Sequence, residues 1–225
     1  MKNIACILAS ECDVYWTKDN NVIVAHADED MKINGLYPWQ HTVEELRAAG
    51  KLPNGEDIPT MEEYLDYLMK NSRCTELWID IKAIYYQKAM YYEPSIKATV
   101  RSCEIIDEMG ANDYVKFISS RHLQIMDPSV AAAKKIGVSV GWMANAPVEE
   151  YVGNSYDWAN LGFYHMKDGF DSLRINSFLD AGIRFSVYTV DTDELMDAYA
   201  GYSDRLYGIT TNYPKKMMDV LNERR

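Results

Sequence analysis

The sequence of 225 residues predicts an α/β fold in which parallel strands alternate with helices. Two observations carry this prediction. From residue 76 onward, short runs rich in Val, Ile, Trp, Phe and Tyr alternate with amphipathic runs that end at glycine. Six such strand segments follow from residue 76 onward and one begins at Glu11, which makes seven besides one hairpin arm, whereas a TIM-type (β/α)8 barrel has eight. We therefore expect a (β/α)8 barrel that lacks its first βα unit and has seven parallel strands plus a short hairpin arm.

The composition predicts a single globular domain over residues 1–225, with 48% hydrophobic and 25% charged residues. A net charge of −11 argues against nucleic acid or an anionic membrane as the main partner. The four cysteines show no Cys-x-x-Cys spacing, so we expect buried free thiols. The apolar run at residues 4–9 is too short for a usual signal peptide, and no run is long enough to span a membrane. The chain as written is expected to be cytoplasmic, or exported if a signal precedes it.

Residues 10–30 are predicted to form a strand, a polar turn and a second strand. Glu11 and Asp13 are two positions apart, so their side chains share one face of the first strand. The polar run at residues 18–21 is expected to make the turn. With those four residues as the loop, Tyr15 would lie opposite Val24, and Asp13 opposite His26. The hairpin would thus place a histidine beside two carboxylates.

The following elements are predicted in order from caps, periodicity and glycine stops. Two Thr-x-x-Glu capping boxes begin helices at Thr42 and Thr60. A helix is expected from Pro94 to Gly110, with Ile96, Val100, Cys103 and Ile106 on its buried face. Five more helices are expected: one that ends at Ile136, one that begins at Pro147, one over residues 172–181, one that follows an N-cap at Asp191, and one that begins at Pro214. Strands are expected at 76–82, 114–119, 138–142, 158–164, 184–190 and 206–210.

The strand at 76–82 adds a second set of charged side chains. Trp78, Asp80 and Lys82 share one face of this strand. Asp80 and Lys82 can therefore point toward Glu11 and Asp13. Converging carboxylates suit a hard divalent cation, and a neighbouring imidazole suits proton transfer near neutral pH. The plainer alternative is that Glu11 and Asp13 form a solvated strand face and that His26 is structural.

Several segments together resemble the glycerophosphodiester phosphodiesterase family, whose members are (β/α)8 barrel enzymes. The similarity runs from Glu11 to the C-terminus. It rests on the order and spacing of six motifs, at residues 11–19, 22–26, 58–65, 79–82, 187–191 and 208–214. The resemblance implies metal-dependent hydrolysis of a small-molecule glycerophosphodiester to an alcohol and glycerol 3-phosphate.

The same resemblance implies roles for individual residues. Glu11, Asp13 and Asp80 would hold a divalent cation, Mg²⁺ or Ca²⁺. His26 would be one of two acid/base histidines, and Lys82 would approach the phosphate. Position 80 is Asp where the family usually has Glu, and the usual His-Asp pair is here His26-Ala27-Asp28.

Two further residues are candidates for substrate binding. His165 follows Tyr164 at the end of a predicted strand, at the rim where barrel active sites collect. Tyr188 occupies a position where the family often has Trp, so it is a candidate for stacking on a substrate, with simple core packing as the alternative. The two remaining histidines, His41 and His122, are predicted to be structural or solvated.

The family's opening strand, which ends in His-Arg, has no counterpart in the sequence, so we expect an open barrel with a gap beside Glu11. An open edge predicts low stability or self-association. With one of two catalytic histidines missing, activity is expected to be weak, and a truncated N-terminus would explain the gap. The alternatives are a binder of metal or phosphodiesters without turnover, and a purely structural barrel.

Overall fold

The computed structural model describes residues 9–71, 76–82, 89–119, 123–154 and 156–224. These residues belong to two compact units, Leu8–Val140 and Gly141–Arg225. Because the relative placement of the two units is not determined, each is described by itself. Two of the four cysteines, Cys6 and Cys74, lie outside the described part, as do His122 and most of the run at residues 4–9.

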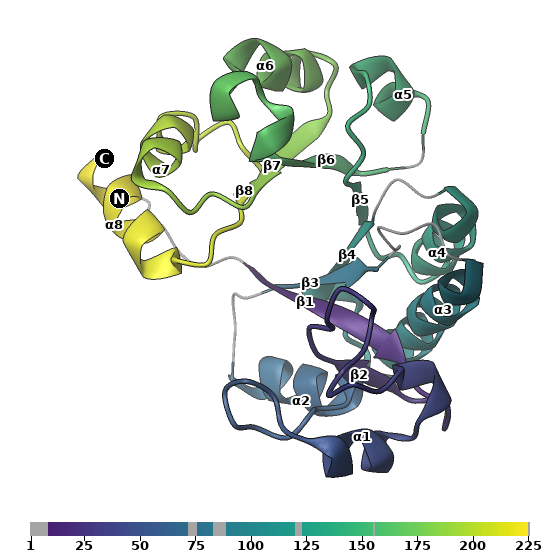
Figure 1. Ribbon diagram of the computed structural model, residues 1–225. Coiled ribbons are helices and arrows are strands. Elements are labelled where there is room, and N and C mark those ends of the chain that lie inside the picture. Colours follow the sequence, from purple (N-terminus) through teal and green to yellow (C-terminus); the bar gives the residue numbers. More distant parts are fainter. Residues whose placement is uncertain (1–8, 72–75, 83–88, 120–122, 155, 225) are drawn as a thin grey trace. The chain divides into compact units, whose positions relative to one another are not determined.

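The unit Leu8–Val140 is an α/β layer whose strands follow the order β2-β1-β3-β4. β1 is antiparallel to β2 and parallel to β3, and β3 is parallel to β4. Its helices α3 and α4 lie side by side (Figure 1), and α2 packs against β2. The strands are β1 (Ala9–Trp16), β2 (Val22–Val24), β3 (Glu76–Ile81) and β4 (Val115–Ser119). The helices are α1 (Val43–Ala49), α2 (Met61–Asn71), α3 (Tyr92–Met109) and α4 (Leu123–Lys135), with 3-10 turns at Pro38–Gln40, Ala89–Tyr91 and Asn112–Tyr114.

The unit Gly141–Arg225 continues the alternation with parallel strands in the order β5-β6-β7-β8. Its strands are β5 (Val140–Trp142), β6 (Trp158–Gly162), β7 (Arg184–Tyr188) and β8 (Gly208–Ile209). Its helices are α5 (Val148–Val152), α6 (Ser172–Asp180), α7 (Asp193–Ala200) and α8 (Pro214–Glu223), with 3-10 turns at Phe163–His165 and Lys167–Gly169. The predicted alternation is thus confirmed in both units. The hairpin arm, β2, is the antiparallel member and belongs to the unit Leu8–Val140.

Close backbone approach explains one glycine of β5. A Cβ added to Gly141 would lie 2.2 Å from the indole of Trp158 on β6. Trp158 is fully buried. Only glycine therefore lets this large ring fill the space beside β5.

The predicted helix boundaries are confirmed to within a few residues, with one corrected cap. α1 begins at a complete capping box, in which Thr42 accepts from the Glu45 backbone and Glu45 accepts from the Thr42 backbone. α7 is capped by Thr192 and not by Asp191. The Asp191 carboxylate accepts instead from the backbone and side-chain amides of Asn212. Because the Asp191 carboxylate is already held by Asn212, it does not cap α7.

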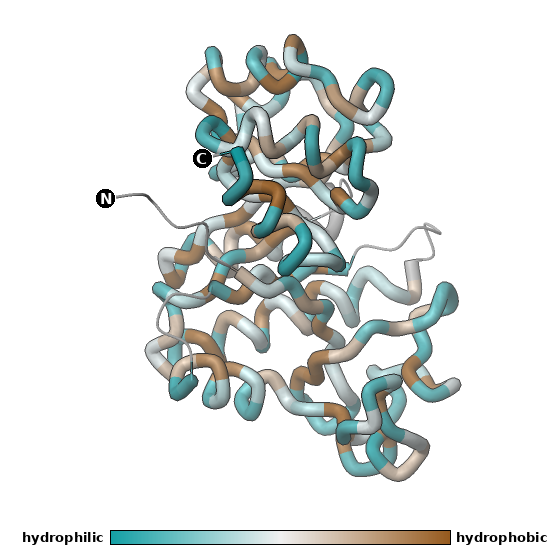
Figure 2. Tube along the Cα trace, turned by 90° about the vertical axis from the view of Figure 1, so that its left-hand side faces the viewer, coloured by the Kyte–Doolittle hydropathy of each residue, from teal (hydrophilic) through white to brown (hydrophobic). Residues whose placement is uncertain are grey.

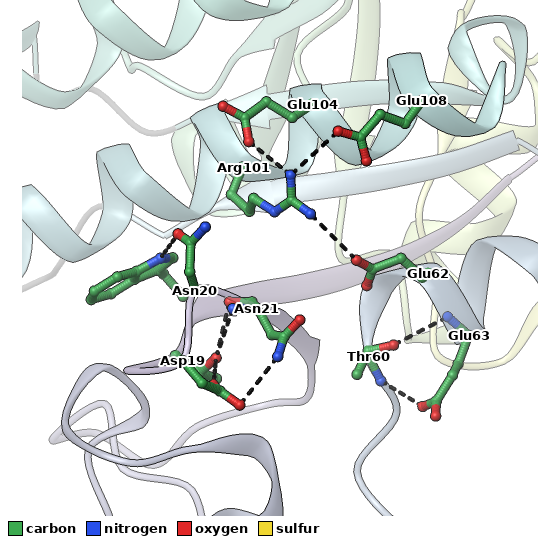
Figure 3. Close-up of polar contacts among 11 residues, drawn as sticks. Asp19, Asn20, Asn21, Thr60, Glu62, Glu63, Arg101, Glu104 and Glu108 are labelled. Carbon is green, nitrogen blue, oxygen red and sulfur yellow. Dashed lines mark hydrogen bonds and ion pairs between the residues drawn. The ribbon is translucent and has the colours of Figure 1, made fainter.

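Arg101 on α3 joins two helices (Figure 3). Its guanidinium lies 2.8 Å from Glu104 and 3.6 Å from Glu108 on the same helix, and 3.9 Å from Glu62 on α2.

The buried face of α3 differs from the predicted one, because Val100 is exposed while Thr99 and Ser102 are buried. These two small polar residues allow α3 to pack closely, and the Thr99 hydroxyl donates to the Ser95 carbonyl at 3.1 Å.

The second capping box offers a direct test of how α2 is held. Glu63 donates its backbone N–H to the Thr60 hydroxyl at 3.2 Å, and its carboxylate accepts from the Thr60 backbone at 2.8 Å (Figure 3). We expect Thr60→Ala to lower the free energy of unfolding by about 1 kcal/mol, the usual contribution of an N-cap. Urea denaturation measures the change. Thr60→Ser is the control, since it keeps the hydroxyl, and equal losses in both variants would contradict the capping role.

Hydrophobic and hydrophilic stretches alternate along the trace (Figure 2). Among the described helices, none combines the length and the apolar character that crossing a membrane requires. Cys12 and Cys103 are buried free thiols, as predicted for the cysteines.

Candidate metal and phosphate site

The first part of the site is on β1. Asp13 is buried and Glu11 is exposed, with the buried Cys12 between them. Alternation along the strand places the two carboxyl side chains on the same face. This agrees with the arrangement expected from their spacing in the sequence.

The second part is on β3, which is the parallel neighbour of β1. The strand register makes Asp13 and Asp80 Cα partners. Asp80 is also buried, with 7% of its surface exposed. Potential ligand atoms of Glu11, Asp13 and Asp80 all lie within 4.8 Å of one another. Three carboxylates from two adjacent strands thus converge on one point.

Lys82 joins the two aspartates. Its Nζ lies 2.9 Å from Asp13 Oδ1 and 2.7 Å from Asp80 Oδ2. The other oxygens, Asp13 Oδ2 and Asp80 Oδ1, are buried and accept no hydrogen bond among the described residues. Each aspartate therefore presents one oxygen to the lysine and keeps one oxygen available.

The crowding of charge is visible in the pKa values. Loss of hydration, followed by the charges of Asp80 and Asp13, raises the pKa of the Glu11 carboxyl to about 8, although Glu11 as a whole residue is exposed. Burial likewise raises the pKa of Asp80. Desolvation acts to lower the pKa of Lys82, but the charges of Asp80 and Asp13 outweigh it, and the Lys82 pKa is raised. One ammonium thus leaves the three carboxyl groups with an excess of negative charge, which a divalent cation would offset.

His26 lies beside Asp13, but not through the predicted strand pairing. Its Nε2 is 3.8 Å from Asp13 Oδ2, and its side chain is 86% exposed. The hairpin pairs Tyr15 with Ile23, so the predicted register, with Tyr15 opposite Val24, is wrong by one residue. It is the Ala25 backbone N–H that donates to the Asp13 carbonyl, at 3.3 Å.

The register is shifted because Thr17 belongs to the turn. Its backbone N–H donates to the Asn21 carbonyl at 2.9 Å, and its hydroxyl donates to Asp19 Oδ1 at 2.6 Å. Figure 3 shows Asn21 reaching the same carboxylate. The loop therefore has five residues where four were expected, and Trp16 pairs with Val22.

The two candidate substrate-binding residues lie in the other unit, at the ends of β6 and β7. The Tyr188 hydroxyl is 3.2 Å from that of Tyr164, and the Tyr164 ring contacts the His165 ring at a centroid distance of 4.4 Å. The strand predicted to reach residue 164 ends at Gly162, and His165 lies in a 3-10 turn. Tyr164 links the two candidates and was not singled out from the sequence, where its position next to His165 was the available signal.

His41 is half-buried, and its Nδ1 is 3.0 Å from the Tyr37 carbonyl, in agreement with a structural role.

A small pocket next to Lys82 was also not predicted. Aromatic side chains form much of its lining, and the Trp39 and Tyr91 rings meet edge to face at 5.2 Å. The lining residues are Val14, Tyr15, Trp16, Met31, Trp39, Lys82, Tyr91, Pro94, Ser95 and Ala98. Aromatic residues at the end of β1 were the sequence signal that could have indicated it.

The α/β fold with alternating parallel strands, and three carboxylates on adjacent strands that could hold a metal ion, can be compared with known proteins. Residues 9–216 match the model of the glycerophosphoryl diester phosphodiesterase family. The chain therefore belongs to the glycerophosphoryl diester phosphodiesterase family, a family of phosphodiester hydrolases. No curated protein sequence matches the chain.

Solved structures show the same fold. A glycerophosphodiester phosphodiesterase from Agrobacterium tumefaciens is 16% identical, with a TM-score of 0.70, and the match covers 94% of this chain and 87% of that one. A phosphodiesterase from Oleispira antarctica, solved with the product sn-glycerol-3-phosphate, is 16% identical, with a TM-score of 0.69 over 94% of this chain and 84% of that one. A glycerophosphodiester phosphodiesterase from Thermotoga maritima is 18% identical, with a TM-score of 0.59 over 96% and 84% of the two chains.

Proposed function

We propose that this chain hydrolyses glycerophosphodiesters to an alcohol and glycerol 3-phosphate with the help of a divalent cation. The observation that carries the proposal is the pair Asp13 and Asp80 next to Glu11. Each aspartate has one oxygen on Lys82 and one buried oxygen that accepts no hydrogen bond from the described residues. Family membership and the glycerol 3-phosphate bound to the Oleispira antarctica phosphodiesterase support the substrate class.

The donor set fits Mg²⁺ or Ca²⁺, because carboxylate oxygens are the preferred ligands of both ions. Glu11, Asp13 and Asp80 would hold the ion. When bound, such an ion neutralises charge that builds on phosphate oxygens in the transition state.

The remaining roles belong to side chains of the protein. Lys82 would add a positive charge near the phosphate, since its Nζ lies among the carboxylates. His26 is exposed, so its imidazole can reach a bound substrate. There it would donate a proton to the leaving alkoxide as the P–O bond breaks, or accept one from the attacking group. A substrate-binding role for His165 and Tyr188 stays a prediction. The closure of the barrel, the single-domain organisation and self-association through an open edge stay predictions.

The test is the release of glycerol 3-phosphate from glycerophosphocholine. We expect turnover with Mg²⁺ or Ca²⁺, complete loss in excess EDTA, and recovery when the cation is restored. The cation should also raise the melting temperature, because a ligand that binds the folded state stabilises it. Absence of turnover with every cation tried would contradict the proposal.

The alternative is a protein that binds phosphodiesters without hydrolysing them. It is favoured by the loose placement of His26, whose Nε2 is 3.8 Å from Asp13 Oδ2 while its side chain is 86% exposed. This alternative predicts cation-dependent binding of glycerophosphocholine in calorimetry with no product. His26→Ala would then leave binding nearly intact.

A further inference from the structure

Lys82 occupies the place where a cation would neutralise the two aspartates. We propose that Lys82 is the built-in counter-ion of the cluster, that it competes with the divalent cation for Asp13 and Asp80, and that cation binding releases its ammonium for an anion. The inference rests on the proposed function, since it assigns regulation of the same site. This role differs from simple phosphate binding, because Lys82 competes with the cation for the same two carboxylates.

The need for a counter-ion follows from burial. Asp13 and Asp80 are 5% and 7% exposed, and burying two carboxylates without a partner is costly. Lys82 contacts both through one oxygen each. In the absence of a cation, the lysine therefore holds the two strands' acidic side chains together.

Competition follows from the same distances. An ion that bound Asp13 and Asp80 would lie close to the Lys82 ammonium, and like charges at such separations repel strongly in a partly buried site. The lysine must then shift, or the cation must bind more weakly than the carboxylates alone would allow.

The surroundings of Lys82 permit the side chain to move while its backbone stays fixed. The Ser95 hydroxyl donates to the Lys82 carbonyl at 2.6 Å, which anchors the main chain. Lys82 also lines the small pocket together with Tyr15 and Ala98, and its side chain is 26% exposed, so it is not enclosed on every side. A flexible four-carbon stem makes lysine suited to two positions.

The experiment measures cation binding without any substrate. Calorimetry at pH 8 compares Ca²⁺ and Mg²⁺ affinities of the whole chain with those of Lys82→Met, which removes the charge but keeps the length of the side chain. We expect the variant to bind the cation at least about tenfold more tightly, and to melt at a lower temperature in EDTA. Lys116→Met is the matched control, because Lys116 pairs with Glu76 on the neighbouring strand, and it should leave cation affinity unchanged. Equal or weaker cation binding in Lys82→Met would overturn the inference.

A second measurement uses the protein without any substitution, so it does not depend on whether a variant folds. Acetylation of lysines followed by peptide mass spectrometry should show Lys82 reacting several times faster with saturating Ca²⁺ than in EDTA, while the rate for Lys116 stays constant. An unchanged or slower rate at Lys82 would overturn the release of the ammonium. Neither readout requires turnover. An inactive protein that shows both effects would contradict the proposed function alone, and an active protein that shows neither would contradict this inference alone.

Discussion

Replacing Asp13 with asparagine is expected to lower kcat/KM for glycerophosphocholine by about 10²- to 10³-fold, as for the loss of a group that stabilises charge in the transition state. The substitution keeps the shape of the side chain but removes a negative charge that is buried and within 2.9 Å of Lys82. An amide would also present a donor where the site needs an acceptor. Steady-state kinetics and calorimetric cation titration both measure the loss.

Asp28→Asn is the matched control for this prediction. Asp28 follows β2 on an exposed turn, where its Oδ1 accepts from the backbone of Asp30 and Lys32. Asparagine keeps that acceptor, so the control should retain activity and cation affinity. If Asp13→Asn behaves like Asp28→Asn, the carboxylate cluster is not the metal site.

The largest expected effect on stability concerns Leu46 on α1. It is fully buried in the hydrophobic cluster beneath the β1–β2 hairpin, together with Tyr15, Ile23 and Ile58. We expect Leu46→Ala to cost about 2 to 5 kcal/mol, because truncation removes buried methyl groups and leaves a cavity. Since Ala25 and Ala27, the neighbours of His26, belong to the same cluster, hydrogen exchange in β1 and β2 should also become faster.

Leu173→Ala makes the same chemical change at an exposed position on α6, where the leucine is 81% exposed. It should alter the free energy of unfolding by no more than about 0.5 kcal/mol. Urea denaturation of both variants, with exchange followed by mass spectrometry, measures the difference. Comparable stability of the two variants would show that the cluster can collapse around the missing side chain.

Much of the candidate site could be predicted because strands impose a period of two. That period places Glu11 with Asp13, and Asp80 with Lys82, whatever the rest of the chain does. The parallel register of β1 and β3 then brings the two pairs together. The bridging position of Lys82 could not be predicted, because it depends on rotamers that respond to the charge on the adjacent strand.

The errors came from polar side chains that bond to the backbone. Thr17 was counted as a strand residue, but its hydroxyl and N–H close the turn, and this shifts the hairpin register. In α3, an apolar period suggested that Val100 faces inward. Hydrophobicity alone could not show that the polar residues Thr99 and Ser102 are buried on this helix instead.

Asp80 on β3, and Lys82 directly after the end of that strand, also bear on how the protein folds. β1 can pair with β2 through a short loop, whereas pairing with β3 requires closure of the much longer connection over residues 17–75. That late step brings two aspartates together, which by itself would oppose closure. Because Lys82 is two residues beyond Asp80, the neutralising charge arrives with the second aspartate. We therefore expect the long-range pairing of β1 with β3 to need no metal ion.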